Sequence, residues 1–500
     1  MRGVSRGSKS QAGSGERALP PAARRALLAL TLLLAGLYAL TAKGYVEIAD
    51  TGFSVQSARA LYRQGTLAIE PGFGTLAGPD GRHYSRYGPA LPLLYLPLIA
   101  LGEGAGAATG LDPALVSDFL VSLANAPWGA LCCALLALLA LRWGASLEQA
   151  CGLAVLLGLG TVLWRYATCD FNEALQACLL LGAYAGLTAD PSRRGPALGA
   201  SLAMGALLAC KVVFVLYLPL GLLYAALQPA RRRQLPLLAI GPVLGLVFVL
   251  GMNALRFGSP FETGYGQSAA GFGLSALPRN LWLLTLSSEA GMFVYSPILA
   301  LGLAGWPRFF RRRPREAALA AALIALNLLV AASWSSPTGG WSWGPRLLVP
   351  ALPLWLLPAL YAWPRQDRVA ARRGLAALSL ASLLVAGIGA LQTTQEYHHL
   401  RFTAAPAEVR DELPGDVLGV SLILSKKLRG QGGRYPLRDF GVDSPAVVDT
   451  GAFESFQGLN LWTSHAARKL RRPALAWLPL LCAPWLLLLL LPYRRALGKD

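Results

Sequence analysis

The stretch "SPTGGWSWGPRLLVPALP", residues 336–353, lies between two strongly apolar runs. It contains two tryptophans, three glycines and one arginine, although a turn between two helices needs only a Gly or a Pro. Arg346 follows a Gly-Pro pair directly and begins the next apolar run, where a cation opposes the helix dipole. The pattern therefore indicates either an anionic partner for Arg346 or an arginine that extends to a membrane interface beside Trp341 and Trp343.

The composition around this stretch is that of a polytopic membrane protein. Hydrophobic residues make up 54% of the 500 residues and charged residues only 14%, whereas soluble domains carry about a quarter. Long apolar runs recur from residue 25 to residue 491, which excludes a soluble protein with a single anchor. The formal net charge is +19, but the arginines cluster between apolar runs, as topology selection requires. We therefore expect an all-α membrane protein and no nucleic-acid partner.

The apolar runs predict about twelve transmembrane helices. Their expected positions are 26–43, 114–141, 148–165, 173–189, 196–210, 212–228, 235–254, 293–307, 317–334, 346–363, 374–392 and 473–492. With these spans, the arginine-rich connectors and both termini fall on one side of the membrane, which the positive-inside rule makes cytoplasmic. The run 89–102, "PALPLLYLPLIALG", contains three prolines and would invert every later connector if it spanned. We expect it to be an interfacial or re-entrant helix on the outer face.

Four regions follow from this topology. Residues 1–25 are expected to form a disordered, basic cytoplasmic tail, and residues 26–392 the transmembrane module, with 44–113 as its first outer loop. Residues 393–472 have mixed charge and few apolar runs, so we expect an extracytoplasmic loop or small module there. Residues 473–500 would hold the last transmembrane helix and a basic cytoplasmic tail. The seven cysteines show neither a disulfide framework nor a CxxC pair.

Four acidic residues stand where predicted spans meet the outer face. Glu47 and Asp50 follow the first span, and Asp170 and Glu173 stand three apart at the mouth of the span 173–189. An acid before a helix is typical of a cap, which satisfies free amide groups and favours the dipole. The same position suits a general base or a pair of catalytic carboxylates. The residues alone leave both interpretations open, because a cap also holds a carboxylate in place.

Basic and aromatic residues of the outer segments form a second group of candidates. Lys211 stands between two apolar runs in "CKVVF", where it either extends to the interface or binds a lipid phosphate. The motif "GRHYSRYGPALPLLYLP" closes the polar part of the first outer loop, and "RFGSPFETGYG" follows a later span. The candidates from these two motifs are Arg82, His83, Tyr84, Arg86, Tyr87 and Tyr265.

The order of these motifs resembles that of bacterial GT-C glycosyltransferases, the superfamily of protein O-mannosyltransferases and lipid A aminoarabinose transferases. An acid after the first span is followed by "GRHYSRYGPALPLLYLP", "WRYATCDFNEAL", "RFGSPFETGYG", "SSEAGMFVYSPILAL" and "GGWSWGPRLLVPALP", over roughly residues 26–365. The similarity is to family 39-like enzymes that depend on a polyprenyl-phosphate carrier. It implies a GT-C-type fold in the bacterial cytoplasmic (inner) membrane, with a large first outer loop that carries juxtamembrane helices.

The resemblance implies an enzyme that moves a sugar from a polyprenyl-phosphate carrier to an acceptor on the outer face. Asp50 would bind or deprotonate the acceptor hydroxyl, with Glu47 as the rival, and either Asp170 or Glu173 would be the second acid. Many relatives have two adjacent acids after the first span, whereas Asp50 stands alone before a threonine. Displacement opposite the leaving phosphate would invert the anomeric centre. Candidate ligands of that phosphate are Arg82, Arg86, Lys211 and Arg346, while Trp341 and Trp343 would line the sugar or prenyl groove.

No cofactor besides the lipid-linked donor and no metal is expected. No His/Cys cluster is present in the sequence, and His398 and His399 are adjacent, which is a poor geometry for a shared ligand. The acceptor would be a glycan, a lipid or a protein. Two alternatives stay open. A ligase or polymerase of the O-antigen type would take its sugars from a diphosphate carrier, and a transporter or flippase of lipid-linked sugars would place ionisable residues at the bilayer midplane.

Overall fold

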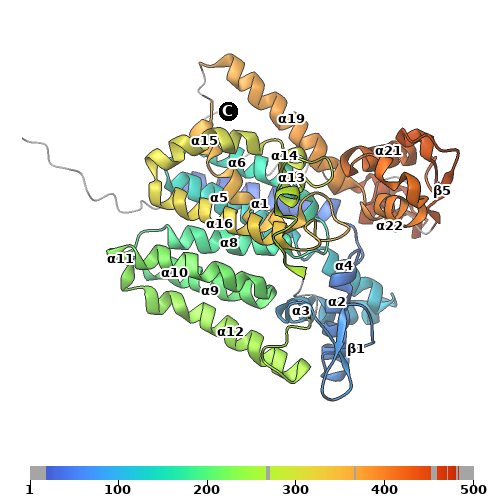
Figure 1. Cartoon of the computed structure of the whole chain (residues 1–500), viewed down its shortest axis with the longest axis horizontal. Helices are drawn as coiled ribbons and strands as arrows, with labels where there is room; N and C mark the ends of the chain where they lie inside the picture. The colour runs from blue at the N-terminus through green and yellow to red at the C-terminus, as the bar shows by residue number, and fades with distance from the viewer. Residues whose placement is uncertain are drawn as a thin grey trace, which may run out of the picture.

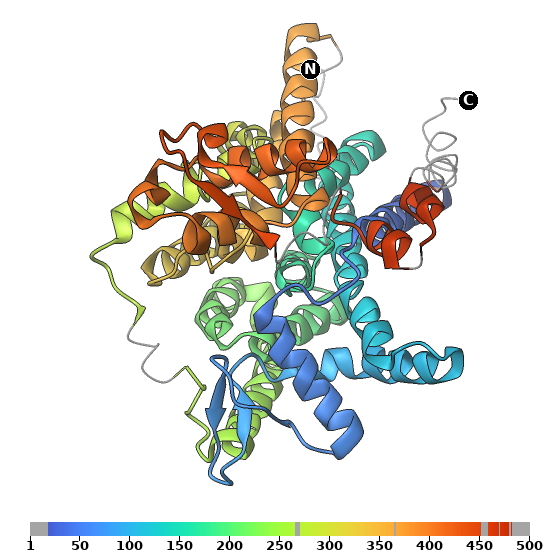
Figure 2. The same cartoon turned by 90° about the vertical axis from the view of Figure 1, so that its right-hand side faces the viewer.

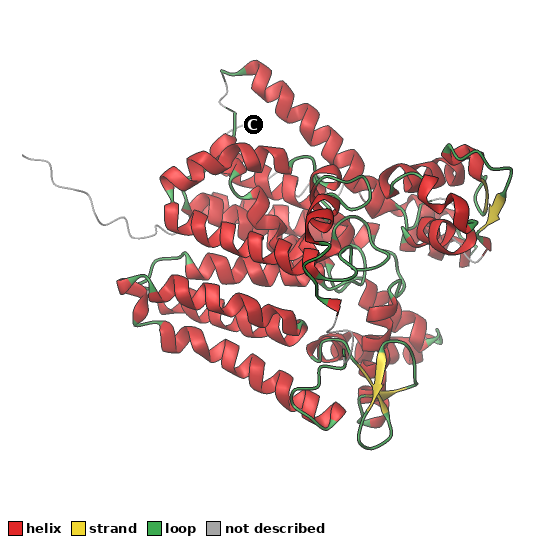
Figure 3. Cartoon of the chain, viewed as in Figure 1, coloured by secondary structure: helices red, strands yellow, loops and turns green. Residues whose placement is uncertain are grey.

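The computed structural model describes residues 19–265, 271–364, 367–451, 459–469, 471–479 and 482. Within these residues, six helices are long and apolar enough to cross a membrane, and five shorter apolar helices add to them. The chain is therefore a multi-pass, mostly helical membrane protein (Figure 1, Figure 3). The predicted number of about twelve spans is not confirmed. The predicted tail 1–25 is described only from residue 19, and most of the predicted last span lies outside the described residues.

The bundle forms because its runs are rich in leucine and alanine, the residues with the strongest preference for helix. Its helices are α1 (Pro21–Thr41), α5 (Ala126–Arg142), α6 (Leu147–Leu159), α7 (Leu163–Ala167), α8 (Glu173–Leu187), α9 (Arg194–Cys210), α10 (Leu218–Ala226), α11 (Pro229–Arg232), α12 (Leu235–Phe257), α13 (Leu277–Thr285), α14 (Met292–Tyr295), α15 (Leu299–Arg312), α16 (Pro314–Ser333), α17 (Leu352–Leu356), α18 (Ala359–Ala362) and α19 (Val369–Leu391). Two 3-10 helices, η1 (Val212–Tyr217) and η3 (Arg346–Ala351), lead into α10 and α17.

Several predicted spans are broken into pieces, among them 114–141, 148–165, 293–307 and 346–363. The run 114–141 forms α4 (Pro113–Ser122) and α5, which are separated at Asn125. The side-chain amide of Asn125 donates to the carbonyl oxygens of Cys169 (2.8 Å) and Phe171, so the break is held by a tertiary contact. The run 346–363 consists of η3, α17 and α18, because its prolines remove backbone donors. These runs are not single helices, although Pro113–Arg142 as a whole is long and apolar enough to cross a membrane. The boundary at Lys211 lies between α9 and η1 as predicted.

The segment between α1 and α5 covers one end of the bundle. It comprises α2 (Ala49–Gln64), α3 (Ala90–Thr109), α4 and an antiparallel sheet of β1 (Ala68–Ile69), β2 (Thr75–Ala77) and β3 (His83–Ser85), in the order β1-β3-β2. In Figure 2, α9 and α10 are seen nearly along their axes, whereas α2 and α3 lie across the picture. This arrangement agrees with a surface helix at 89–102, although α3 is longer than that run and is itself long enough to span.

Residues 393–451, here called the C-terminal module, lie at the same end, on the right in Figure 1. The module contains α20 (Gln395–His399), η4 (Leu400–Ala404), η5 (Ala407–Glu412), α21 (Asp416–Leu428), β4 (Arg434–Pro436), η6 (Leu437–Phe440) and β5 (Val447–Asp449), with β4 and β5 antiparallel. Its centre holds a buried ion pair between Lys427 and Glu396, and the Tyr435 hydroxyl donates to the same carboxylate (2.9 Å). The chain then returns to α1 through α22 (Trp462–Lys469), followed by η8 (Pro473–Trp477).

The arginine-rich connectors gather at the other end of the bundle, on the left in Figure 1. The guanidinium of Arg313, between α15 and α16, lies 4.8 Å from the centre of the Trp143 ring, which follows α5. Arg231, in α11, donates to the carbonyl oxygen of Ala189, which follows α8. The connectors that the predicted topology assigns to one side of the membrane therefore contact one another in these two pairs, away from the outer segments.

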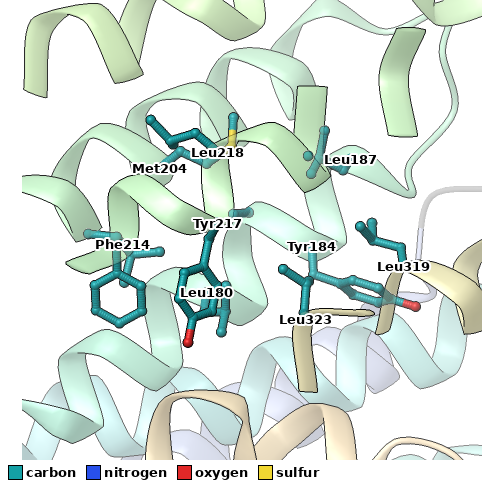
Figure 4. A pocket seen from close by; sticks show the side chains of 12 residues that line it. Leu180, Tyr184, Leu187, Met204, Phe214, Tyr217, Leu218, Leu319 and Leu323 are labelled. Atoms are coloured by element: carbon teal, nitrogen blue, oxygen red, sulfur yellow. The ribbon is translucent and has the colours of Figure 1, made fainter. Parts of the chain in front are cut away.

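The interior between the two ends is apolar. A cavity among α8, α9, η1, α10 and α16 is lined by aliphatic side chains, Met204, Phe214, Tyr184 and Tyr217 (Figure 4). Within the described part of the chain, every buried charged side chain lies near a helix end or in the C-terminal module. A transporter would need ionisable groups near the middle of the bundle. The distribution of charge therefore disfavours the transporter alternative.

Helices α9 and α12 cross at small residues, and this crossing supports a stability prediction. A Cβ atom on Gly241 of α12 would lie 1.9 Å from the carbonyl oxygen of Ser201 on α9. We expect Gly241→Val to force the helices apart and to lower the free energy of unfolding by about 1–3 kcal/mol or more. Gly251→Val on the same helix is the control, because no atom lies within 4 Å of a Cβ there. Equal thermal unfolding midpoints of the two variants in detergent would contradict the prediction.

Candidate active site

Arg346 joins two carboxylates that are far apart in the chain. Its Nε donates to Glu173 Oε1 (2.7 Å), and its Nη1 lies 3.3 Å from Asp50 Oδ2. Nη1 also donates to the carbonyl oxygen of Gly339 (3.0 Å), and the guanidinium carbon lies 3.6 Å from the centre of the Phe171 ring. The anions beside this arginine are thus carboxylates of the protein itself, which offset the unfavourable position of a cation at a helix start.

The turn before Arg346 depends on its glycines. Gly339, Gly340 and Gly344 have φ angles of 81°, 91° and 67°, in the left-handed region that residues with a side chain rarely adopt. These angles let the chain double back, so that the Gly339 carbonyl oxygen reaches the guanidinium seven residues later.

The two tryptophans of the turn lie in different surroundings. Trp343 is 1% exposed and packs edge-on against Tyr295, with 4.9 Å between ring centres, so it belongs to the core. Trp341 is 38% exposed, and its ring centre lies 6.0 Å from that of His398 in the C-terminal module. Only Trp341 is therefore available at the surface of this turn.

Asp50 and Glu173, the two carboxylates that contact Arg346, are here called the arginine-linked pair. Asp50 is the accessible member of this pair. It lies in the first turn of α2, and its side chain is 33% exposed. Its Oδ1 accepts a hydrogen bond from the Tyr87 hydroxyl (2.7 Å), while its Oδ2 faces Arg346. Burial and the negative charge of Asp50 raise the pKa of Tyr87, so the hydroxyl stays protonated and donates. A carboxylate held by two donors and reached by solvent is suited to accept a proton from a bound hydroxyl.

Glu173 is the buried member. It is the first residue of α8 and is 1% exposed. Arg346 holds one of its oxygens, while Oε2 has no hydrogen-bond partner among the described residues. Lys211 interacts electrostatically with Glu173, Arg346 and Asp50, and burial lowers its pKa. No salt bridge within the described part of the chain includes Lys211, which makes its amine group a candidate contact for a bound anion.

Arg86 and Tyr265 extend this cluster. The Arg86 guanidinium lies 5.5 Å from the ring centres of both Tyr87 and Tyr265, and its Nε is buried without a hydrogen-bond partner among the described residues. Arg256, near the end of α12, donates to the carbonyl oxygens of Ser85 (2.7 Å) and Tyr87 (3.2 Å). The sequence around Tyr87 is therefore anchored to the bundle.

Three other candidates of the first outer loop point elsewhere. Arg82 is 64% exposed and lies 3.9 Å from Asp80, and the Tyr84 hydroxyl donates to the same Asp80 (2.7 Å). The ring of His83 lies 3.3 Å from the hydroxyl oxygen of Thr75 on β2. These side chains stabilise the hairpin of β2 and β3, and the structure does not bring them to Arg346.

Asp170 and Glu47 hold the loop that leads to Asp50. The Asp170 carboxylate accepts hydrogen bonds from the backbone N–H groups of Glu47 (3.2 Å) and Ile48 (3.1 Å). Ile48 is the N-cap of α2 and offers no side-chain cap, so Asp170 satisfies this helix end from another segment. Glu47 forms an ion pair with Arg165 (2.6 Å), and both side chains are 2% exposed. The four acids thus form two separate groups, with Asp50 and Glu173 on Arg346.

Three residues in or beside the candidate active site were not predicted from the sequence. Arg165 and Phe171 stand in "WRYATCDFNEAL", where the acids alone were considered, and Thr393 stands in a region without a recognised motif. The Thr393 hydroxyl donates to Glu47 Oε1. An arginine inside an otherwise apolar run was a signal for Arg165, because such a charge needs a partner. Nothing local marked Thr393.

Comparison with known proteins finds similarity in three dimensions. No family model matches the chain, and no curated protein matches it. ArnT from Cupriavidus metallidurans bound to undecaprenyl phosphate superposes with a TM-score of 0.47 at 17% identity, over 81% of this chain and 70% of ArnT. ArnT in the apo state gives a TM-score of 0.48 at 16% identity, over 82% and 70%. The oligosaccharyltransferase AglB from Archaeoglobus fulgidus, in complex with an inhibitory peptide and a dolichol-phosphate, gives 0.47 at 14%, over 78% and 59%.

The environment of Asp170 predicts a pH dependence of stability. Burial, and next the negative charge of Glu47, raise the pKa of Asp170 from 3.8 to about 7. In the unfolded chain Asp170 loses its proton near pH 4, whereas the folded protein keeps it up to about pH 7. The folded state therefore binds more protons in this window, and its free energy of unfolding falls as the pH rises from about 4 to about 7.

Asp170→Asn cannot titrate and should lack this contribution. We expect the thermal midpoint of the wild type to fall by several degrees relative to that of Asp170→Asn between pH 4.5 and pH 7.5 in detergent. Asp112→Asn, at the exposed N-cap of α4, is the control. A constant difference between wild type and Asp170→Asn over this range would show that Asp170 keeps its ordinary titration.

Proposed function

We propose that the chain is an inverting glycosyltransferase that moves a sugar from a polyprenyl-phosphate carrier to an acceptor at the outer face of a bacterial cytoplasmic membrane. The observation that carries the proposal is the contact of the accessible Asp50 with Arg346, beside Lys211, which makes no salt bridge within the described part of the chain. The motif order, which resembles that of GT-C enzymes, supports the same class. The site lies opposite the arginine-rich connectors, which the positive-inside rule assigns to the cytoplasm.

In the proposed reaction, the acceptor oxygen forms a bond to the anomeric carbon of the sugar while the bond from that carbon to the phosphate oxygen breaks. The acceptor proton passes to the Asp50 carboxylate, and the electrons of the broken bond leave with the polyprenyl phosphate, which gains one negative charge. Tyr87 and Arg346 orient the Asp50 carboxylate for this transfer. Attack opposite the leaving group inverts the anomeric centre.

The leaving phosphate needs cations that the protein has not already neutralised. Arg346 is largely occupied, because its guanidinium contacts two carboxylates and a carbonyl oxygen. Lys211 and Arg86 make no salt bridge within the described part of the chain, so we assign the phosphate to them. Glu173 Oε2 has no hydrogen-bond partner among the described residues, and in the proposed complex it accepts a hydrogen bond from a sugar or acceptor hydroxyl. The donor is a substrate, and the proposal includes no resident metal or cofactor.

The proposal leaves the sugar open, and the acceptor is a glycan, a lipid or a protein. A diphosphate-linked donor, as an O-antigen-type ligase would use, is the remaining alternative within the transferases. Purified protein in nanodiscs supplied with radiolabelled polyprenyl-phosphate sugars distinguishes the two. Label that leaves the lipid supports the proposal, whereas transfer only from a diphosphate-linked glycan would replace it by the ligase function.

Asp50→Asn tests the general base. Because a positioned base contributes about 10²- to 10⁴-fold to the rate, we expect kcat to fall by that factor while the donor still binds. Asp80→Asn is the matched control, since Asp80 belongs to the same outer segment but contacts Tyr84 in the hairpin. Turnover that survives in Asp50→Asn at the wild-type rate would remove Asp50 from the catalytic role.

Lys211→Met tests the phosphate ligand. Loss of a charge-assisted contact to the donor should lower kcat/KM by about ten- to a hundredfold, mainly through a higher KM for the lipid-linked sugar. Arg82→Met removes an exposed cation from the hairpin and should leave both constants near the wild-type values. Equal effects of the two substitutions would indicate a general electrostatic contribution and no specific phosphate site.

A further inference from the structure

The C-terminal module touches both sides of the candidate active site through one short stretch at its start. The Thr393 hydroxyl donates to Glu47 Oε1, and both side chains are almost fully buried, at 1% and 2% exposed. Two residues later, the Gln395 side-chain amide donates to the carbonyl oxygen of Trp341 (3.0 Å). Glu47 stands three residues before Asp50, and Trp341 stands five residues before Arg346. The two contacts therefore reach the segments that carry the arginine-linked pair.

We propose that Thr393 and Gln395 are positioning residues that hold Asp50 and Arg346 in register with each other. Thr393 acts through the loop before α2, and Gln395 acts through the glycine turn before η3. This role gives residues 393–395, at the start of the C-terminal module, a function that their sequence does not reveal. The effect on turnover rests on the proposed function, whereas the effect on the geometry of the two segments does not.

The loop before α2 is held from two separate parts of the chain, the segment 165–170 and Thr393. Arg165 holds one carboxylate oxygen of Glu47 (2.6 Å), Thr393 holds the other, and Asp170 accepts the backbone N–H (3.2 Å). Without the threonine hydroxyl, one oxygen of a buried carboxylate loses its hydrogen bond, and the side chain must move to find another donor or water. Because Ile48, the next residue, is the N-cap of α2, this movement reaches the first turn that carries Asp50.

The stretch is itself anchored on both sides, which a positioning element requires. Before it, the Lys43 ammonium donates to the carbonyl oxygen of Ala390 (2.6 Å), between the end of α1 and the end of α19. After it, Arg401 forms an ion pair with Glu289 (2.7 Å), in the loop between α13 and α14. Thr393 and Gln395 therefore sit on a fixed support, and their contacts transmit its position to the site.

The neighbouring Thr394 provides a matched control. It is also buried, but its hydroxyl has no hydrogen-bond partner among the described residues. Thr393→Val and Thr394→Val remove the same group from adjacent positions, and Thr393→Ser keeps the donor while removing a methyl group. If the buried hydroxyls contribute only to stability, Thr393→Val and Thr394→Val should both destabilise the protein. If Thr393 positions the site, only Thr393→Val should change the geometry and turnover.

The experiment measures amide hydrogen exchange and transfer kinetics on the full chain in nanodiscs. We expect Thr393→Val to raise the exchange of the backbone amides at residues 47–52 about tenfold, and to lower kcat by about ten- to a hundredfold with an unchanged KM for the donor. Thr393→Ser should restore both quantities, and Thr394→Val should match the wild type. Gln395→Ala should raise exchange at residues 339–346 in the same way.

Exchange at 47–52 that stays at the wild-type level in Thr393→Val, or that rises equally in Thr394→Val, would overturn the proposal. So would a change confined to the thermal midpoint, with exchange and kcat unaltered. If the wild type transfers no sugar but exchange still rises in Thr393→Val alone, the positioning role stands and the proposed function fails. The two proposals are therefore separated by one set of variants.

Discussion

The end of the bundle that holds the candidate active site depends on the interaction of one guanidinium with two carboxylates. Arg346 is 12% exposed, Glu173 is 1% exposed, and neither charge could be buried alone without a cost of several kcal/mol. The pair is stable because each group neutralises the other and because Phe171 covers the open face of the guanidinium. Asp50 shares the same cation, so the accessible carboxylate takes its position from a buried pair.

This arrangement explains why the surrounding sequence is unusual. A cation at the start of a helix is unfavourable. In the same turn, three positions have φ angles in the left-handed region, which glycine adopts much more readily than other residues. The turn brings a carbonyl oxygen to Arg346, while the bundle around it keeps an apolar interior. Buried charged groups in the bundle thus lie near helix ends, and those around Arg346 lie at the end opposite the arginine-rich connectors.

The sequence predicted part of this site and missed part of it for identifiable reasons. The conflict between Arg346 and the helix dipole indicated an anion, and the motif order indicated Asp50. The choice between Asp170 and Glu173 could not be made, because residues three apart share a face only within one helix. Since α8 begins at Glu173, Asp170 lies in the loop before it and turns to the amides of residues 47 and 48. Helix breaks such as that at Asn125 could not be predicted from the local sequence, because the contacts that stabilise them come from distant segments.

The long sequence separation of these contacts has a consequence for the biogenesis of the protein. Glu47 meets Arg165 across 118 residues but Thr393 across 346, and Asp50 meets Arg346 across 296. Membrane helices are inserted in order as the ribosome moves along the message, so Asp50 and Glu173 are synthesised well before the cation that they share. The contacts that join Asp50 and Glu173 through Arg346 therefore form late, and the candidate site is completed only after residue 346 has been synthesised.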